Sequence, residues 1–132
     1  MFVKNFSENE KRCFAELLLI MAMVDGKIQD EESELLETYC TEMNLEELPT
    51  NLRNLDVILK DLETSENPIK YSIYFELFVL ARADNNIDNN ELKLLNELIS
   101  KLGISVKKVT DIQNAVEKLS QVYEEIINIV LE

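Results

Sequence analysis

The sequence predicts an all-α fold, a compact bundle of about six to seven helices built around two related helix–corner–helix repeats. Apolar residues make up 46% of the 132 residues, and only 2 glycines and 2 prolines are present, a composition that favours helix over disorder. Apolar positions recur at steps of three and four, and no segment alternates like a strand. This length suits a single domain, residues 1–132, with its own core.

The first repeat begins with a helix and ends near Asn44. Ser7 and Glu10 have the S-x-x-E spacing of a capping box, which predicts that a helix begins there. An apolar stripe follows on one helical face, and the Asp25-Gly26 pair ends it. A second helix is expected to follow this corner. The stripe of the first helix is Phe14, Leu17, Leu18, Met21 and Val24, and that of the second is Leu35, Leu36, Tyr39 and Met43.

The middle of the chain predicts two further helices. After Pro49, Leu52, Leu55, Leu59 and Leu62 mark a third helix. Asn67-Pro68 then opens a fourth, because proline suits the first helical turn. Its sequence, "YSIYFELFVLARA", is apolar on nearly every face and is predicted to run to Asp84. A helix of this kind belongs in the centre of a bundle.

Two helices complete the chain. Asp88 and Glu91 have D-x-x-E spacing and predict the start of a fifth helix, which Gly103 ends as a residue just past the helix. A long helix over about 105–131 follows. Its apolar residues alternate steps of three and four, as in a heptad repeat. Either this seam packs on the rest of the domain, or part of it pairs with a partner. The heptad positions are Val109, Ile112, Val116, Leu119, Tyr123, Ile126 and Val130, and the predicted partner seam is Tyr123, Ile126, Ile127 and Val130.

The corner between helices is written twice, in "MAMVDGKIQDEESELL" and "VLARADNNIDNNELKLL". The repeat halves are about 7–44 and 68–103. One interpretation is purely structural: the aspartate ends a helix, the isoleucine plugs the gap, and the glutamate supports the start of the next helix. The matching pairs are Ala22 with Ala81, Asp25 with Asp84, Ile28 with Ile87, Glu32 with Glu91, Leu35 with Leu94 and Leu36 with Leu95.

The other interpretation of the corners is a divalent cation site. D-G-x-I-x-x-x-E resembles the second half of an EF-hand loop, but the first half lacks ligands, so the chain has no EF-hand. Two converging corners would still offer four carboxylates, and Ca²⁺ or Mg²⁺ prefers such oxygen ligands. Nine acids and one lysine lie between residues 25 and 47. The candidate ligands are Asp25, Glu32, Asp84 and Glu91, with Asp30, Glu31 and Asp88 as supplements.

The segments "LLLIMAMVDGKIQDEESELLETYCTEMNL" and "ELFVLARADNNIDNNELKLLNELISKLGIS" are similar to the TerB-like family, named for tellurite resistance protein B. The resemblance implies one TerB-like helical domain whose corners face each other and hold a divalent metal at the four matched acids. It also implies an adaptor role in tellurite or stress resistance rather than catalysis. Asn85 and Asn86 replace the usual glycine-containing pair, and Gln29 replaces the usual capping residue.

Composition narrows the function classes. The net charge of −13 argues against nucleic acid and anionic lipid and favours protein partners with a basic surface. There is no histidine, and no nucleophile motif or phosphate loop, so an enzyme built on paired carboxylates is the least favoured function.

No segment spans a membrane or forms a signal peptide, although peripheral association through a partner is compatible with this. Cys13 and Cys40 are expected to be reduced core residues in the cytoplasm. A homodimer through the last helix is the main alternative function.

Overall fold

The computed structural model describes residues 2–24, 37–44, 51–82 and 87–132. Within these ranges the chain forms helices and no strand, which confirms the predicted all-α class. A helical segment at residues 37–42 accompanies the labelled elements. These are η1 (Phe2–Asn5), α1 (Glu8–Met23), α3 (Leu55–Leu62), α4 (Asn67–Ala81), α5 (Asn89–Leu102) and α6 (Val106–Leu131).

Helix boundaries follow local signals at several ends. At the start of α1, the Glu10 N–H donates to Ser7 Oγ at 3.2 Å, and the Ser7 N–H donates to Glu10 Oε1 at 2.9 Å. The predicted capping box is therefore confirmed. At the end of α5, Gly103 adopts φ 68°, the left-handed conformation that glycine takes without steric penalty. Asn44 also has a positive φ, 58°, two residues after the helical segment at 37–42.

Two predicted boundaries were wrong. The third helix begins at Leu55 rather than at Leu52. Asn54 caps it by accepting a hydrogen bond from the Asp56 N–H at 3.2 Å, and the preceding residue is held by a long-range contact described below. The fourth helix ends at Ala81, and its C-cap, Arg82, has φ −95° and ψ 6°. It therefore ends three residues before the expected Asp84, which lies outside the described residues.

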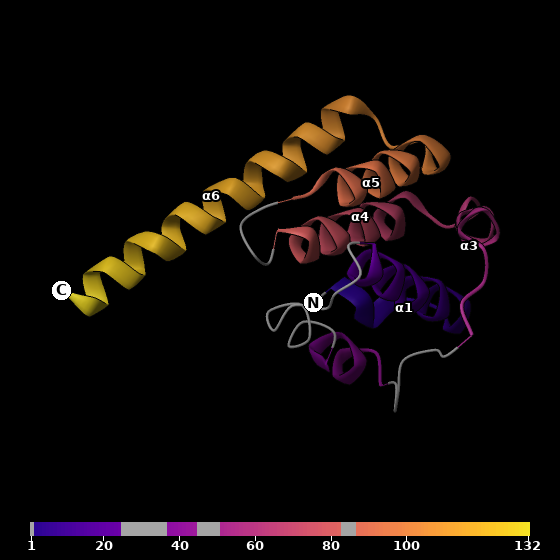
Figure 1. Cartoon of the computed structure of the whole chain (residues 1–132), viewed down its shortest axis with the longest axis horizontal. Coiled ribbons are helices and arrows are strands. Elements are labelled where there is room, and N and C mark those ends of the chain that lie inside the picture. The colour runs from indigo at the N-terminus through magenta and orange to yellow at the C-terminus, as the bar shows by residue number, and fades with distance from the viewer. Residues whose placement is uncertain (1, 25–36, 45–50, 83–86) are drawn as a thin grey trace.

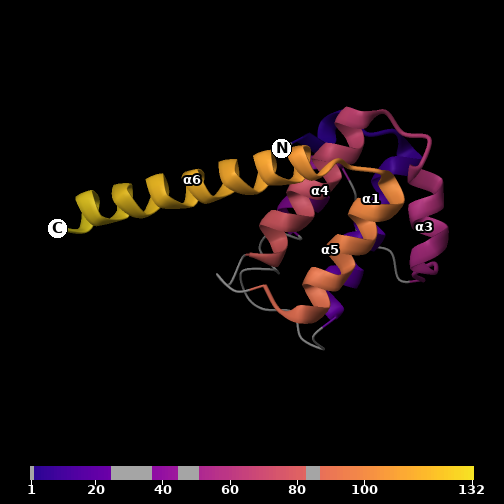
Figure 2. The same ribbon diagram turned by 90° about the horizontal axis from the view of Figure 1, so that it is seen from above.

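The mostly apolar helix α4 lies in the middle of the bundle, as its sequence predicted. It packs against α1, α5 and α6, while α3 packs on α1 and α5. Figure 1 shows α4 between α1 and α5, and Figures 1 and 2 both show α3 at the far edge from the C-terminus. Each neighbour covers one face of α4, so a helix without a polar face is satisfied here.

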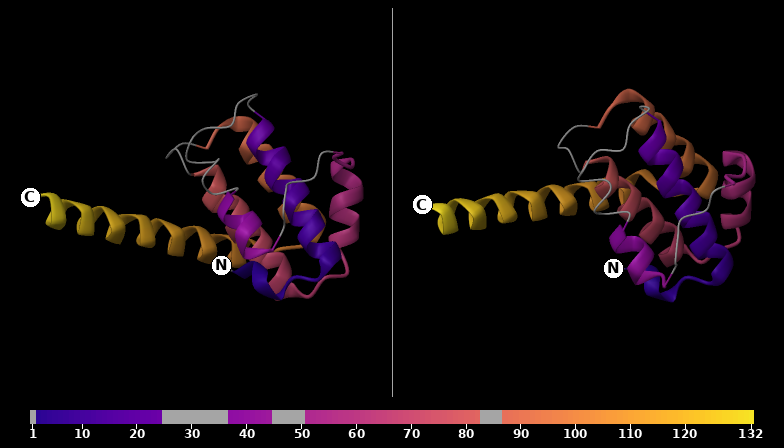
Figure 3. Two further views of the ribbon diagram at one scale, coloured as in Figure 1. Left: turned by 90° about the horizontal axis from the view of Figure 1, so that it is seen from below. Right: turned by 60° about the horizontal axis from the view of Figure 1, so that its bottom comes forward.

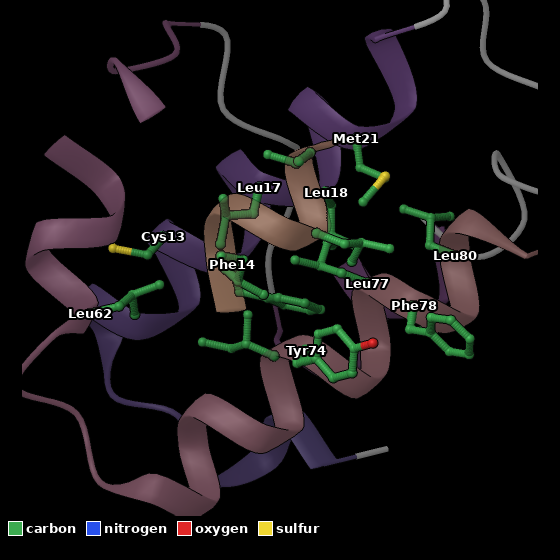
Figure 4. Close-up of a cluster of buried hydrophobic side chains, with 14 of the residues drawn as sticks. Cys13, Phe14, Leu17, Leu18, Met21, Leu62, Tyr74, Leu77, Phe78 and Leu80 are labelled. Atoms are coloured by element: carbon green, nitrogen blue, oxygen red, sulfur yellow. The ribbon is translucent and has the colours of Figure 1, made fainter. Parts of the chain in front are cut away.

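One contiguous core joins these helices. Phe14 stacks edge-to-face with Phe6 and Tyr39, with ring centroids 5.6 and 5.3 Å apart, arrangements worth about 1 kcal/mol each beyond burial. Figure 4 shows α1 and α4 side chains interleaving in this core. Its largest fully buried members are Tyr74, Phe14, Leu17, Leu18, Met21, Met43, Ile58, Leu59, Leu62, Ile73, Leu77 and Leu80.

Helix α6 is divided into a docked half and a projecting half. In the docked half Val116 is buried, Gln113 Nε2 donates to Tyr74 Oη at 2.9 Å, and the Lys108 ammonium lies 4.9 Å from the centre of the Tyr71 ring. From residue 117 to 132 every residue is exposed. Figures 1 and 2 show this half extending well beyond the other helices, and both views in Figure 3 agree. None of the described helices is long and apolar enough to cross a membrane.

Candidate functional site

The repeated corners lie partly outside the described residues. Of the predicted cation ligands, Asp25, Asp30, Glu31, Glu32 and Asp84 fall outside them, and Glu91 and Asp88 fall inside. In the described part of the chain, no group of three or more acids or cysteines is placed to hold a metal ion. The four-carboxylate site therefore stays a prediction.

The two described acids of the second corner support the start of α5. The Glu91 N–H donates to Asp88 Oδ1 at 2.8 Å, and the Asp88 N–H donates to Glu91 Oε1 at 3.2 Å. This reciprocal capping box satisfies two N–H groups that would otherwise lack helical partners. Glu91 is 5% exposed. The structural interpretation of the D-x-x-E spacing is thus confirmed for this corner.

The end of α1 lies beside the beginning of α5. Asn90 Nδ2 donates to the backbone oxygen of Val24 at 3.4 Å, across 66 positions of sequence. Because Asp25 follows Val24 directly, the chain enters the first corner next to the capping box of the second. Figures 2 and 3 show these two helix ends on the same side of the bundle.

An open groove of about 330 Å³ borders this contact. Its walls come from α1, α3 and α5, and its mixture of aliphatic and polar groups was not anticipated from the sequence. The signal was present in the three- and four-residue spacing of the α5 members, which share one helical face. The lining residues are Ile20, Val24, Leu55, Asn90, Lys93, Leu94 and Glu97.

An ion cluster forms around Glu16, a buried residue in the middle of α1. Glu16 is 0% exposed, and its carboxylate accepts from the Arg53 backbone N–H at 2.9 Å and from the Arg53 guanidinium at 2.8 and 3.0 Å. Arg12 lies 3.4 Å from the same carboxylate. Burial raises the pKa of Glu16, but the hydrogen bonds and charge of Arg53 outweigh burial and hold that pKa below its usual value.

The remaining contacts of Arg53 show that this cluster connects two helices. Its Nη1 lies 2.6 Å from Asp61 Oδ2 in α3, and its Nη2 donates to Cys13 Sγ at 3.4 Å. Burial raises the pKa of the Cys13 thiol despite the opposing hydrogen bond from Arg53, so the thiol stays protonated and unreactive. The cluster joins α1 to α3 and leaves no activated nucleophile.

A second buried acid, Glu76, interrupts the apolar sequence of α4. Glu76 is 2% exposed, and its backbone oxygen accepts from Tyr39 Oη at 3.4 Å. Burial and the nearby Glu76 charge raise the pKa of Tyr39. In the sequence, Glu76 is recognisable as the one charged residue in the apolar run "YSIYFELFVLA". Cys13 and Cys40 are both free thiols, the first buried as expected and the second only half-buried.

The predicted partner seam lies on the projecting half of α6, and all four of its residues are exposed. Tyr123 is 64%, Ile126 50%, Ile127 38% and Val130 72% exposed. Four more apolar side chains surround them. We call the whole set the α6 apolar face: Leu119, Val122, Tyr123, Ile126, Ile127, Ile129, Val130 and Leu131.

Apart from Ser120, the polar residues of this half-helix lie on its other side. At 100° per residue, the α6 apolar face covers a little more than half of the helix circumference. The opposite arc holds Glu117, Lys118, Gln121, Glu124, Glu125, Asn128 and Glu132. Such an arc keeps the helix hydrated, while the apolar face has nothing beneath it in the described part of the chain.

No family model, curated protein or solved structure matches this chain. The similarity to the TerB-like family therefore stays a prediction.

Proposed function

We propose that this protein is a non-catalytic interaction module whose working surface is the α6 apolar face. The observation that carries this proposal is the exposure of a large apolar surface on a helix that projects from its own domain. Contiguous apolar patches of several hundred Å² are rare on monomeric proteins and mark interaction sites. Removing apolar surface from water contributes about 25 cal/mol per Å², so this face strongly favours association.

Three of the described carboxylates support a non-catalytic role. Asp88 and Glu91 cap α5, and Glu16 is held by Arg53. A general acid or base needs a shifted pKa near the working pH together with access to substrate. Glu16 is fully buried with a lowered pKa, so it meets neither condition.

Affinity capture from cells that express the chain naturally tests the module with one matched pair of variants. Ile126→Glu places a charge in the α6 apolar face, and Gln121→Glu places the same charge on the polar arc of the same helix. We expect wild type and Gln121→Glu to retain the same proteins, including further copies of the chain, and Ile126→Glu to lose them. Identical retention by all three would overturn the proposal.

A second candidate function is binding of a divalent cation at the repeated corners. The Asn90–Val24 contact supports it, because this contact places the residue before Asp25 beside the corner that contains Glu91. Carboxylates from two corners would supply the hard oxygen ligands that Ca²⁺ or Mg²⁺ takes. Asp25, Glu32, Asp84 and Glu91 would hold the ion, and Asp30, Glu31 and Asp88 would supplement them.

Calorimetric titration of Ca²⁺ and Mg²⁺ into metal-free protein tests this second candidate. We expect saturable binding that Asp25→Asn combined with Asp84→Asn abolishes. Glu63→Gln is the matched control, because it removes one acid from the C-cap of α3, away from both corners. Absence of binding to wild type, or binding that the double variant keeps, would overturn the cation site.

The wider role that we propose follows from the TerB-like resemblance and from charge. It is that of a cytoplasmic adaptor in stress or tellurite resistance whose acidic corner region binds a protein with a basic surface. The net charge of −13 supports such a partner. The α6 apolar face supplies a second, uncharged binding surface on the same molecule.

A further inference from the structure

We propose that the occupant of the α6 apolar face is the same face of a second copy of this chain, paired antiparallel in a two-fold symmetric dimer. This inference rests on the proposed function and names the partner of its working surface. Four observations carry it: the continuous heptad spacing, the self-complementary register, the position of the domain along α6, and the distribution of charge.

The apolar stripe of α6 continues unbroken from the docked half into the projecting half. Val109, Ile112 and Val116 pack against the core. Leu119, Tyr123, Ile126 and Val130 continue the same steps of three and four without a contact to the core. Heptad spacing is the pattern by which one helix packs lengthwise on another. The docked half uses it on α4, so the projecting half is equally suited to a helix.

Antiparallel pairing makes this stripe complementary to itself. In antiparallel coiled coils, each residue at one heptad core position meets the other core position of the partner helix. Leu119 then packs on the partner's Val130, and Tyr123 packs on the partner's Ile126. Val122 and the partner's Ile129 flank these layers and extend the apolar contact. A two-fold axis between the Tyr123 and Ile126 layers generates every contact twice, as a symmetric dimer requires.

The contacts between α6 and the rest of the domain stop at a position that leaves room for a partner helix in this register. The same register places the partner's Leu131 opposite Lys118. Glu117, the residue before Lys118, forms a 2.6 Å ion pair with Arg82 and so connects α6 to the domain. Residues 118–131 span ~21 Å of helix, and in this register the two projecting segments overlap along their whole length. The position of the domain along α6 is therefore compatible with this register, which the heptad spacing permits.

Charge favours antiparallel over parallel pairing. Each chain carries a net charge of −13, and parallel helices would place both acidic domains side by side. Antiparallel helices place them at opposite ends, separated by more than the screening length of ~8 Å at physiological salt. The acids of the projecting half, Glu117, Glu124, Glu125 and Glu132, lie on the polar arc away from the paired faces.

The available area suits a dimer, and the charges exclude an anionic membrane as the occupant. Eight large apolar side chains, each at least 38% exposed, together present on the order of the ~800 Å² that one partner of a stable interface buries. Helices that lie on anionic membranes carry lysine and arginine beside their apolar face. Here four glutamates and a single lysine lie between residues 117 and 132.

Light scattering after size exclusion, over a range of concentrations, measures the association. We expect wild type and Gln121→Glu to elute at twice the chain mass of 15.3 kDa. Ile126→Glu is expected to elute at the single-chain mass and to keep its cooperative unfolding, because Ile126 lies outside the core. A monomeric wild type at every concentration, or a dimer that Ile126→Glu leaves intact, would overturn the proposal.

Thiol cross-linking measures the direction of pairing in a Cys40→Ser background, where the remaining Cys13 is buried. We expect Leu119→Cys combined with Val130→Cys to form a covalent dimer on oxidation. Leu119→Cys alone should not, because antiparallel pairing separates the two copies of position 119 by ~16 Å of helix rise, beyond disulfide reach. Cross-linking of the single variant would show parallel pairing and overturn the register.

These outcomes separate the dimer from the interaction module itself. A monomeric wild type that still loses captured proteins on Ile126→Glu would overturn the second copy and leave the module standing with a different protein. A monomeric wild type that instead floats with phosphatidylcholine vesicles, in a manner that Ile126→Glu abolishes, would assign the face to lipid. A monomer with neither property would overturn both proposals.

Discussion

The carboxylate of Glu16, fully buried in α1, accepts hydrogen bonds from both the backbone N–H and the guanidinium of Arg53, 37 residues later in the chain. This pair places the segment before α3 against the middle of α1. The same arginine continues to Asp61 inside α3, so one side chain joins three parts of the fold. Bidentate geometry of this kind suits arginine rather than lysine.

Arg53→Met is expected to lower the free energy of unfolding by about 3 kcal/mol, because it leaves a buried carboxylate without its main partner. Chemical denaturation at neutral pH measures the loss. Arg12→Met is the matched control. Its guanidinium also pairs with Glu16, but its side chain is 57% exposed, so we expect a change below about 1 kcal/mol. Equal losses in both variants would show that Arg53 has no special role.

The Glu16 contact also makes stability depend on pH. The pKa of Glu16 is lowered in the folded protein from its ordinary value of 4.5. Its contribution is therefore complete above pH 4.5 and is lost as the pH falls through the folded pKa. We expect the gap in unfolding free energy between wild type and Glu16→Gln to narrow as the pH falls below about 4.5. Urea titrations at a series of pH values measure this gap. A constant gap would contradict the ionised pair.

The capping box at α5 predicts a difference between two substitutions of Asp88. Asp88→Ala removes the acceptor for the Glu91 N–H and should lower the free energy of unfolding by about 1 kcal/mol. Asp88→Ser keeps a side-chain acceptor and should lose only a few tenths. Denaturant titration distinguishes them. If serine were as harmful as alanine, the carboxylate itself would have a role beyond capping.

Gly103 ends α5 in the left-handed conformation, at φ +68°. An added Cβ would meet nothing within 4 Å, so only backbone strain opposes a substitution here. We expect Gly103→Ala to lower the free energy of unfolding by about 1 kcal/mol, and Gly103→Asn to lower it less, because asparagine tolerates this conformation better. Thermal unfolding measures both. A loss of more than about 3 kcal/mol would show that packing is disturbed as well.

The α-helical class and several boundaries could be predicted because they depend on residues close in sequence. Capping at Ser7 and Asp88, the glycine after α5 and the apolar surroundings of α4 each reflect interactions within a turn or two of helix. The predicted start of α3 was wrong because Arg53 donates hydrogen bonds to Glu16, and nothing in the neighbouring sequence indicates that contact. Where a long-range contact fixes the start or end of a helix, the spacing of apolar residues in that helix does not reveal the boundary.

The candidate sites divide in the same way. The projecting seam on α6 was identified from its heptad spacing, but the spacing is the same where the helix docks and where it projects. The described acids of the second corner were predicted both as caps and as ligands, and the structure describes them as caps. Asp25, Glu32 and Asp84 lie outside the described residues, so the convergence of all four carboxylates stays a prediction.

The sequence by itself determined the helical elements, the central place of α4 and the amphipathic character of α6, because periodicity and capping act over a few residues. Only the tertiary structure decided that α6 stops contacting the domain at Glu117. That position depends on the ion pair with Arg82 at the end of α4 and on how far the core extends. It also decided that Arg53 meets Glu16. Both are contacts between distant segments, and their free energy exists only once the helices are packed.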